Sequence, residues 1–203
     1  MKRSRSQSLS KTQGETRREA RREPRAPRPL SAQRLEELAL AYVARFSTSA
    51  AKLEGYLARK LRERGWERSQ EDGDCEPQVA ALVARFVAAG YIDDEAYARA
   101  KSGSLLRRGY GERRISQALG AAGIAAELRD VVAVGEGAQR RAALALASRR
   151  KLGPFGAPHA DRAAREKQLA AMLRAGHPLD MARELVNAIS IEAAERWAAE
   201  GDD

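Results

Sequence analysis

Residues 90–124 read GYIDDEAYARAKSGSLLRRGYGERRISQALGAAGI, and this stretch contains the helix starts and stops that decide the fold. Asp93 precedes two further acids, so it is well placed to cap a helix whose dipole favours negative charge in the first turn. The helix should run to about Arg108, although Gly103 within it costs about 1 kcal/mol relative to alanine. The stretch therefore opens with one long helix.

Glycines end this helix and set up the next one. We interpret Gly109-Tyr110-Gly111 as a helix–helix turn rather than a phosphate loop, because it follows a helix and lacks a lysine–hydroxyl pair. Ile115 and Leu119 mark a short helix that ends at Gly123. A third helix is marked by apolar residues further on, namely Leu128, Val131 and Val132. Three helices in a row form one unit.

Two other glycines indicate that this unit is repeated. Gly65 lies 58 residues before Gly123, and Gly176 lies 53 residues after it. The residues four positions before these glycines are all apolar: Leu61, Leu119 and Met172. Eight positions before them, Leu57 and Ile115 keep the pattern and Gln168 breaks it. Two copies of the unit therefore match well and the third matches weakly.

Helical spacing of apolar residues extends on both sides of the stretch, and Ser31 is a candidate N-cap for the first helix. Residues 67–78 are polar, so we expect a loop there, with Cys75 as a surface thiol. A second loop is expected at 153–158. Pro178 should open the last helix. The inner face of that helix would carry Ala182, Leu185, Val186 and Ile189.

These features predict an all-α fold of tandem three-helix repeats in an elongated, curved array. Three short helices make only a small core, so each repeat should rest on its neighbours. The expected organisation is a disordered basic tail at 1–29, a first repeat at 31–92 with the polar insert 67–78, a second repeat at 93–135, and a divergent third repeat at 136–199.

The net charge of +9 on 203 residues belongs mainly to the tail. Residues 1–29 hold ten Lys or Arg and three Glu, so they account for +7 and leave +2 for the rest. Their only large aliphatic side chain is Leu9, which is too little apolar surface to offset the entropy of ordering. The tail either keeps the protein in solution or is a nonspecific basic arm for nucleic acid.

The sequence offers no catalytic or metal-binding set. One cysteine and two histidines, His159 and His177, supply neither a ligand set nor a nucleophile with its base. Asp93 and Asp94 are adjacent at a helix start and do not converge on one point, so we interpret them as capping residues. We predict no enzyme, no cofactor and no metal. No run approaches the ~20 apolar residues of a membrane span. The composition favours a cytoplasmic location.

Basic residues at similar places in successive repeats are more informative. In the helix that ends at Gly65, Lys52, Arg59 and Arg62 project opposite the leucine stripe, and Lys60 lies near it. Later clusters are Arg107, Arg108, Arg113 and Arg114, then Arg140 and Arg141, then Arg149, Arg150 and Lys151. Ordinary solvated helix faces are the alternative interpretation. Few acids lie beside these clusters, which favours the binding of an acidic or polyanionic track.

Three segments in order, at suitable spacing, resemble the RecX family. They are Tyr56–Gly65, Gly90–Ala98 with Arg107–Ile115, and Leu119–Ile124. The resemblance covers roughly residues 33–190, is strong from 53 to 124 and is weak beyond 135. The insert 67–78, the Arg-rich tail and Lys101, where an apolar or aromatic residue is expected, depart from the family pattern.

The resemblance implies tandem three-helix repeats and a monomer that binds RecA and the RecA–single-stranded-DNA filament. It implies regulation, with inhibition expected, of the recombinase and coprotease activities of RecA in DNA repair and the SOS response. The surface candidates for filament or DNA contact are Tyr56, Arg59, Lys60, Arg62, Arg107, Arg108, Arg113, Arg114, Arg149, Arg150 and Lys151. Residues that match the family but are interpreted as structural include Gly65, Gly90, Asp93, Asp94, Tyr97, Gly109 and Gly123.

Two further partners follow from the basic residues themselves. Weak nonspecific DNA binding through the basic surface and the tail is one expectation. The alternative function is a helix-turn-helix-like protein that binds DNA directly, with Arg113, Arg114 and Gln117 on a recognition helix. No membrane partner is expected.

Overall fold

The computed structural model describes residues 28–67, 75–157 and 161–202. All of the predicted tail except its last two residues lies outside this part of the chain. So do the middle of the polar insert and His159. Within the described ranges every regular element is a helix, and the all-α repeat prediction is confirmed.

The first unit contains α1 (Ala32–Arg45), α2 (Ala50–Arg64) and α3 (Cys75–Ala88). The backbone N–H of Arg34 donates to Ser31 Oγ, which confirms the predicted cap. The expected loop at 67–78 is wrong at its end, because Cys75 to Gln78 belong to α3. Pro77 does not prevent this, since proline is tolerated in the first turn, where its missing N–H would have no helical partner.

The second unit contains α4 (Asp94–Arg107), α5 (Glu112–Gly120) and α6 (Ala126–Val131). Asp93 caps α4 as predicted, because its Oδ1 accepts from the backbone N–H of Ala96 at 2.9 Å. The predicted turn at 109–111 is also confirmed.

The third unit contains α7 (Glu136–Arg150), α8 (Arg162–Arg174), α9 (Leu179–Asn187) and α10 (Ile191–Ala199). Short 3-10 turns lie at Gly153–Phe155, inside the loop expected at 153–158, and at Glu200–Asp202.

The prediction for the last helix is wrong beyond Asn187. The chain turns there, and α10 begins after Ser190, whose Oγ accepts from the backbone N–H of Ala193 at 3.2 Å. Ile189 therefore lies in the turn and is 93 % exposed, instead of facing the core. A serine cap next to a helical apolar pattern was sufficient to start a separate helix.

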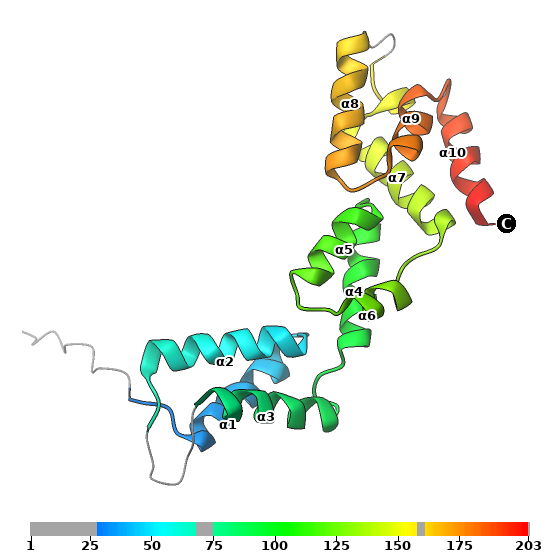
Figure 1. The fold of residues 1–203 in the computed structure, drawn as a ribbon. Helices are drawn as coiled ribbons and strands as arrows, with labels where there is room; N and C mark the ends of the chain where they lie inside the picture. The colour runs from blue at the N-terminus through cyan, green and yellow to red at the C-terminus, as the bar shows by residue number, and fades with distance from the viewer. Residues whose placement is uncertain (1–27, 68–74, 158–160, 203) are drawn as a thin grey trace, which may run out of the picture.

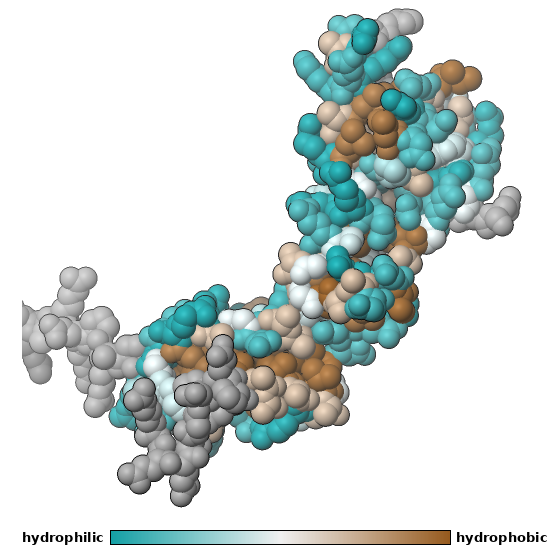
Figure 2. Space-filling view, in the orientation of Figure 1, coloured by the Kyte–Doolittle hydropathy of each residue, from teal (hydrophilic) through white to brown (hydrophobic). Residues whose placement is uncertain are grey.

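The three units lie one after another, with the first displaced to one side of the other two (Figure 1). Each has its own buried apolar cluster: one around Leu35, Leu53 and Phe86, one around Tyr97, Ile115 and Leu119, and one around Leu146, Met172 and Leu185. We propose that these clusters mark repeats with the boundaries predicted from the sequence. Figure 2 shows apolar surface between α2 and α3 and again between α8 and α9.

The glycines that align the repeats share a positive φ. Gly65, Gly123 and Gly176 have φ values of +77°, +76° and +97°. Glycine adopts this left-handed region without the steric cost that a Cβ imposes. The internal alignment therefore matched equivalent helix ends, including the divergent third copy.

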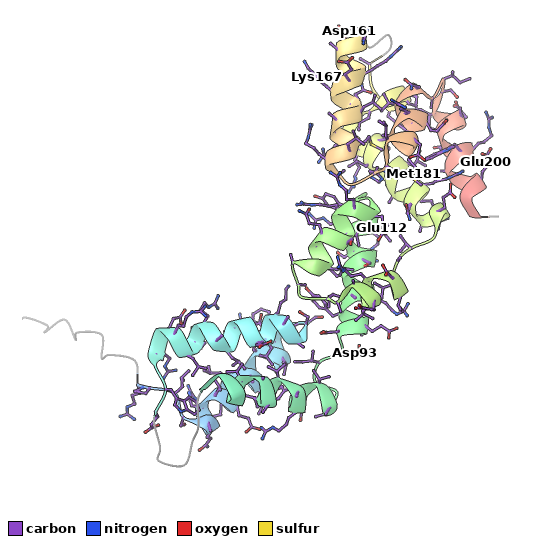
Figure 3. The ribbon with its side chains drawn as sticks, in the orientation of Figure 1. Asp93, Glu112, Asp161, Lys167, Met181 and Glu200 are labelled. Atoms are coloured by element: carbon purple, nitrogen blue, oxygen red, sulfur yellow. The ribbon has the colours of Figure 1, made fainter. Side chains whose placement is uncertain are left out.

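Polar side chains hold the first unit to the second. Asp93 lies at this first joint (Figure 3), and the neighbouring Asp94 accepts from the backbone N–H of Ala50 at 2.8 Å. Ser49 Oγ donates to the Ala122 carbonyl at 2.5 Å. Asp94 therefore serves the first turn of α2, a partner that the local sequence of α4 does not reveal.

Candidate functional site

Backbone hydrogen bonds connect the second unit to the third. The N–H of Gly111 donates to the Ala175 carbonyl at 2.9 Å, and the N–H of Arg113 donates to the Gly176 carbonyl at 3.3 Å. His177 Nε2 lies 3.0 Å from the Gly109 carbonyl oxygen. The turn predicted at 109–111 is thus also the docking point of the third unit, which we call the second joint.

Two glycines of this turn allow the close approach. A Cβ on Gly109 would lie 2.9 Å from the backbone nitrogen of Leu146. A Cβ on Gly111 would lie 2.5 Å from the carbonyl carbon of Gly176. Side chains at these positions would collide with backbone, so glycine is required for the two units to meet.

The second joint brings the ends of α4 and α7 to the first turn of α5, and basic side chains gather there. Two adjoining pockets of about 240 and 370 Å³ share Arg108 and Tyr110. None of the described residues that line them is acidic. We define the joint surface by the polar and aromatic side chains of these pockets: Lys101, Arg108, Tyr110, Arg114, Gln117, Arg149 and Arg150. The side chains seen over α5 are mostly hydrophilic (Figure 2).

Contacts within the joint surface fix some of its cations. The Arg108 guanidinium lies over the Tyr110 ring, 5.2 Å from its centroid. Arg149 donates through Nη2 to the Arg108 carbonyl and through Nε to the Ala145 carbonyl at 3.2 Å. Arg149 therefore ties the end of α7 to the end of α4, while Arg108, Arg114 and Arg150 are exposed and can meet a partner.

Three of the site residues predicted in the second and third units lie outside the two pockets. Arg107 lies along its own helix, with Nη1 3.3 Å from where a Cβ on Gly103 would be. Arg113 is exposed at the start of α5. Lys151 ends α7 in the left-handed conformation, with φ of 55°. The sequence grouped these residues with the joint surface because they are neighbours in the chain.

Lys101 belongs to the joint surface although sequence reasoning did not select it. It is half-buried on α4 and lines the same pocket as Arg114. The available signal was its departure from the apolar or aromatic residue expected at that helix position. A charge at a core-facing position of one helix becomes understandable only once the neighbouring α5 is in place.

The candidates of the first unit form a separate group on α2. Arg59 and Lys60 approach the Tyr56 ring, at 5.7 and 5.9 Å from its centroid. Both also contact Glu63, at 3.6 and 2.7 Å. The hydrogen bond from Lys60 lowers the pKa of the Glu63 carboxyl. Arg62 is exposed on the same helix.

The structure does not bring this group to the joint surface. Ala51, near the start of α2, is the residue that meets Gly123 of the second unit. Arg59 lies about 12 Å further along the helix axis, because each residue adds about 1.5 Å.

One buried ionisable group, His177, lies in the third unit, and one half-buried group, Glu112, lies in the second. Burial lowers the pKa of His177, although the hydrogen bond to the Gly109 carbonyl opposes the shift. Burial raises the pKa of the Glu112 carboxyl, and the backbone of Val134 opposes this with a hydrogen bond. Glu112 is labelled near the boundary between the units in Figure 3. Both pKa shifts are in the direction of the neutral form, as burial at a boundary between units requires.

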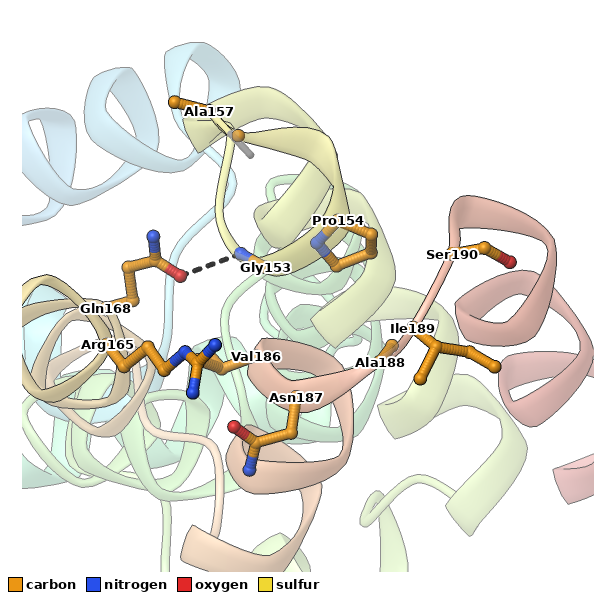
Figure 4. A pocket seen from close by; sticks show the side chains of 11 residues that line it. Gly153, Pro154, Ala157, Arg165, Gln168, Val186, Asn187, Ala188, Ile189 and Ser190 are labelled. Carbon is orange, nitrogen blue, oxygen red and sulfur yellow. Dashed lines mark hydrogen bonds between the residues drawn. The ribbon is translucent and has the colours of Figure 1, made fainter. Parts of the chain in front are cut away.

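A pocket of about 600 Å³ in the third unit (Figure 4) shares no lining residue with the joint surface. Gln168 Oε1 accepts from the Gly153 N–H at 2.8 Å at its wall. Arg165 is the only charged residue among those described as lining it. The pocket therefore lacks the paired ionisable groups of an acid–base site.

In the described part of the chain, no group of three or more His, Cys, Asp or Glu could hold a metal ion. None of the helices described is both long and apolar enough to cross a membrane.

This chain is similar to known proteins in sequence and in fold. The second three-helix domain of RecX matches residues 93–132. The regulatory protein RecX of Myxococcus xanthus is 33 % identical over 168 residues, which cover 81 % of this chain and 90 % of the relative. RecX of a Mycobacterium species (strain KMS) is 33 % identical over 108 residues, or 46 % and 55 % of the two chains.

The crystal structure of RecX from Lactobacillus salivarius has a similar fold, with a TM-score of 0.58 at 16 % identity. The similarity covers 83 % of this chain and 97 % of that one. At this level of identity the match concerns the arrangement of the helices, and it agrees with consecutive helical units, of which the third has four helices here instead of the expected three.

Proposed function

Because the chain belongs to the RecX family of regulatory proteins, we propose that it binds RecA and the RecA–single-stranded-DNA filament and inhibits recombinase and coprotease activity. In this proposal it acts in the cytoplasm, in DNA repair and the SOS response. It is a monomer that needs no cofactor and catalyses no reaction of its own.

The joint surface is the observation that carries this proposal. Four arginines and one lysine from α4, α5 and α7 line its pockets, and no acid is among the described residues there. Like charges kept together with no acidic side chain among the described lining residues favour binding to a surface of opposite charge. An acidic protein surface or a phosphate backbone along a filament would supply that charge.

The elongated arrangement supports the same conclusion. Among the described residues, consecutive units contact one another at two joints, so this part of the chain exposes more surface than a globule of the same mass. The basic side chains of α2, at the other end of the molecule, would then reach a second place on the same filament. We therefore keep Tyr56, Arg59, Lys60 and Arg62 as proposed contacts beside the joint surface.

The RecA ATPase on single-stranded DNA, measured with and without this protein, tests the proposal. We expect inhibition by the wild type and at least a tenfold higher half-inhibitory concentration for R108A/R114A/R150A, since each lost contact of a charged pair contributes about 1 kcal/mol. Because these side chains are exposed, helicity should not change.

The matched control is R34A/R99A/R162A, which removes the same charge. Each of these arginines is exposed and pairs with a glutamate on its own helix. The control should inhibit like the wild type. Equal loss in both variants would show that only total charge matters, and no loss in either would remove the joint surface from the proposal.

The geometry does not favour direct reading of duplex DNA by α5. A recognition helix inserts its amino-terminal residues into the major groove. Here the backbone of the first turn of α5 is bonded to the third unit, since the carbonyl of Gly176 accepts from the N–H of Arg113, although the side chains of Arg113 and Arg114 stay exposed. A duplex groove would have to accommodate the third unit beside this turn.

A further inference from the structure

Three aromatic rings lie in a row where α1 ends and α2 passes it. The rings of Phe46 and Tyr42 have centroids 5.2 Å apart and are tilted by 51°. The rings of Tyr42 and Tyr56 are stacked, with centroids 4.3 Å apart and planes 21° from parallel. Tyr42 and Tyr56 also pack against the core of the first unit. The row is therefore held on its inner side and kept rigid.

The outer end of the row is open to solvent. Phe46 is 49 % exposed and follows the last residue of α1 as its C-cap. A single exposed apolar residue needs no explanation. This one, however, continues a row of ordered rings, so its exposed surface extends a stacking platform.

Cations accompany the rings on both helices. The Arg45 guanidinium lies 5.4 Å from the Phe46 ring centroid, and Arg59 and Lys60 lie within 6 Å of the Tyr56 centroid. Glu63 pairs with Arg59 and Lys60, which leaves the group with a net positive charge. We call the three rings with Arg45, Arg59 and Lys60 the ring cluster.

We propose that the ring cluster is a binding site for single-stranded nucleic acid, in which an unpaired base stacks on Phe46 and the cations contact the adjoining phosphates. Aromatic rings beside cations are the pattern that binds single strands without sequence readout, because every base has a face that can stack. A duplex keeps its base faces covered. An acidic peptide would satisfy the cations and leave the Phe46 ring exposed.

This site is independent of the joint surface and requires no RecA. It goes beyond the proposed function, because it assigns unpaired bases to the first unit. It also differs from the expected nonspecific binding by the tail, which would depend on phosphates alone.

The test compares two fluorescent 15-mers, oligo(dT) and an abasic strand of the same length, by anisotropy with the full-length protein. We expect wild type to bind oligo(dT) about tenfold more tightly than the abasic strand, and F46A to lose that difference. Basic residues outside the ring cluster would contact the phosphates of both strands equally, so they cannot cause a difference in affinity between the two. A strand carrying 2-aminopurine should show quenching with wild type and little with F46A.

Y91A is the matched control, because Tyr91 is an aromatic residue 59 % exposed in the same unit and its nearest ring partner is Phe86. It should keep the preference for oligo(dT). Equal affinity of wild type for the two strands, or an unchanged preference in F46A, would overturn the proposal. A loss in F46A confined to RecA filaments would also overturn it, by making the partner a protein. Since RecA is absent from both binding measurements, failure of the proposed function would leave this test unaffected.

Discussion

The two joints of this molecule are built in different ways. At the first joint, side chains of Ser49 and Asp94 reach across and bond to backbone groups of the neighbouring unit. At the second joint, the side chains of Arg149 and His177 also reach across, but in addition backbone meets backbone through Gly109, Gly111 and Gly176. A side chain can change rotamer to follow a movement, whereas two backbones in contact cannot. The second joint should therefore be stiffer, and it is the one that shapes the joint surface.

Gly111→Ala is the most severe way to break this contrast. Its Cβ would lie 2.5 Å from the backbone of Gly176, which has no side chain to move aside. We expect a loss of about 3 kcal/mol in the free energy of unfolding, at the upper end for overpacking, because two joint hydrogen bonds are stretched as well. Inhibition of RecA should fall with it. Urea unfolding followed by circular dichroism measures the change.

Gly55→Ala is its control. Gly55 lies inside α2 with nothing within 4 Å of an added Cβ, so the substitution should raise stability by up to about 1 kcal/mol. If Gly111→Ala were as well tolerated as Gly55→Ala, the close backbone approach at Gly176 would not make the second joint stiff.

Asp94→Ala is expected to have a smaller effect, at the first joint. It removes the acceptor for the Ala50 N–H at the start of α2, so we expect a loss of about 1 kcal/mol in the free energy of unfolding. The units should also move more freely, which small-angle scattering would show as a broader distribution of dimensions. Asp94→Asn, which keeps an oxygen acceptor, should recover most of the loss.

Asp93→Ala separates capping from joining. Asp93 caps its own helix through Ala96, so its loss should lower stability by a similar amount and leave the scattering profile unchanged. Identical scattering of the two alanine variants would mean that Asp94 does not hold the units together.

The pH dependence of stability should sharpen the comparison, because His177 is only 3 % exposed and belongs to the second joint. Burial lowers its pKa, so below the ordinary value of 6.5 the unfolded chain binds a proton that the folded chain resists. The contribution of His177 to the free energy of unfolding is therefore fully present above pH 6.5. It decreases as the pH falls from 6.5 toward the lowered pKa.

Replacing His177 with glutamine should flatten that slope. The free energy of unfolding of wild type and variant is measured between pH 7.5 and 5.5, and the two values are subtracted at each pH. Because Glu112 is present in both proteins, its contribution cancels in this difference. A variant with the same slope as wild type would exclude His177 as its cause.

Much of the local structure could be predicted because short-range rules govern it. The caps at Ser31 and Asp93 and the helix end at Gly65 depend on groups three or four residues apart. The errors lie where a local rule had a competitor. The helix expected to continue past Asn187 stops, because Ser190 caps a new one, and Ile189 turns outward as a result.

The candidate site was only partly predictable. In the sequence, Arg108 and Arg149 belong to two separate basic clusters and are 41 residues apart. No local pattern indicates that the two residues meet in the folded chain. Sequence reasoning omitted Lys101, which is on the joint surface, and it treated Arg107 and Arg113 as equal to their neighbours. Residues close in the chain are also close in space within one turn of a helix. Between units this relation fails, so the sequence alone does not show which cations share a surface.

By itself, the sequence determined the helices, their repetition and the family, because hydrophobic period, caps and glycines act within a few residues. The tertiary structure alone decided which glycines touch, which aspartate serves another helix and which cations share a surface. The physical reason is that these contacts join residues far apart in the chain, so they depend on how the units dock against one another. Gly111 has an ordinary φ of −82°, so only the position of Gly176 shows why glycine is needed there.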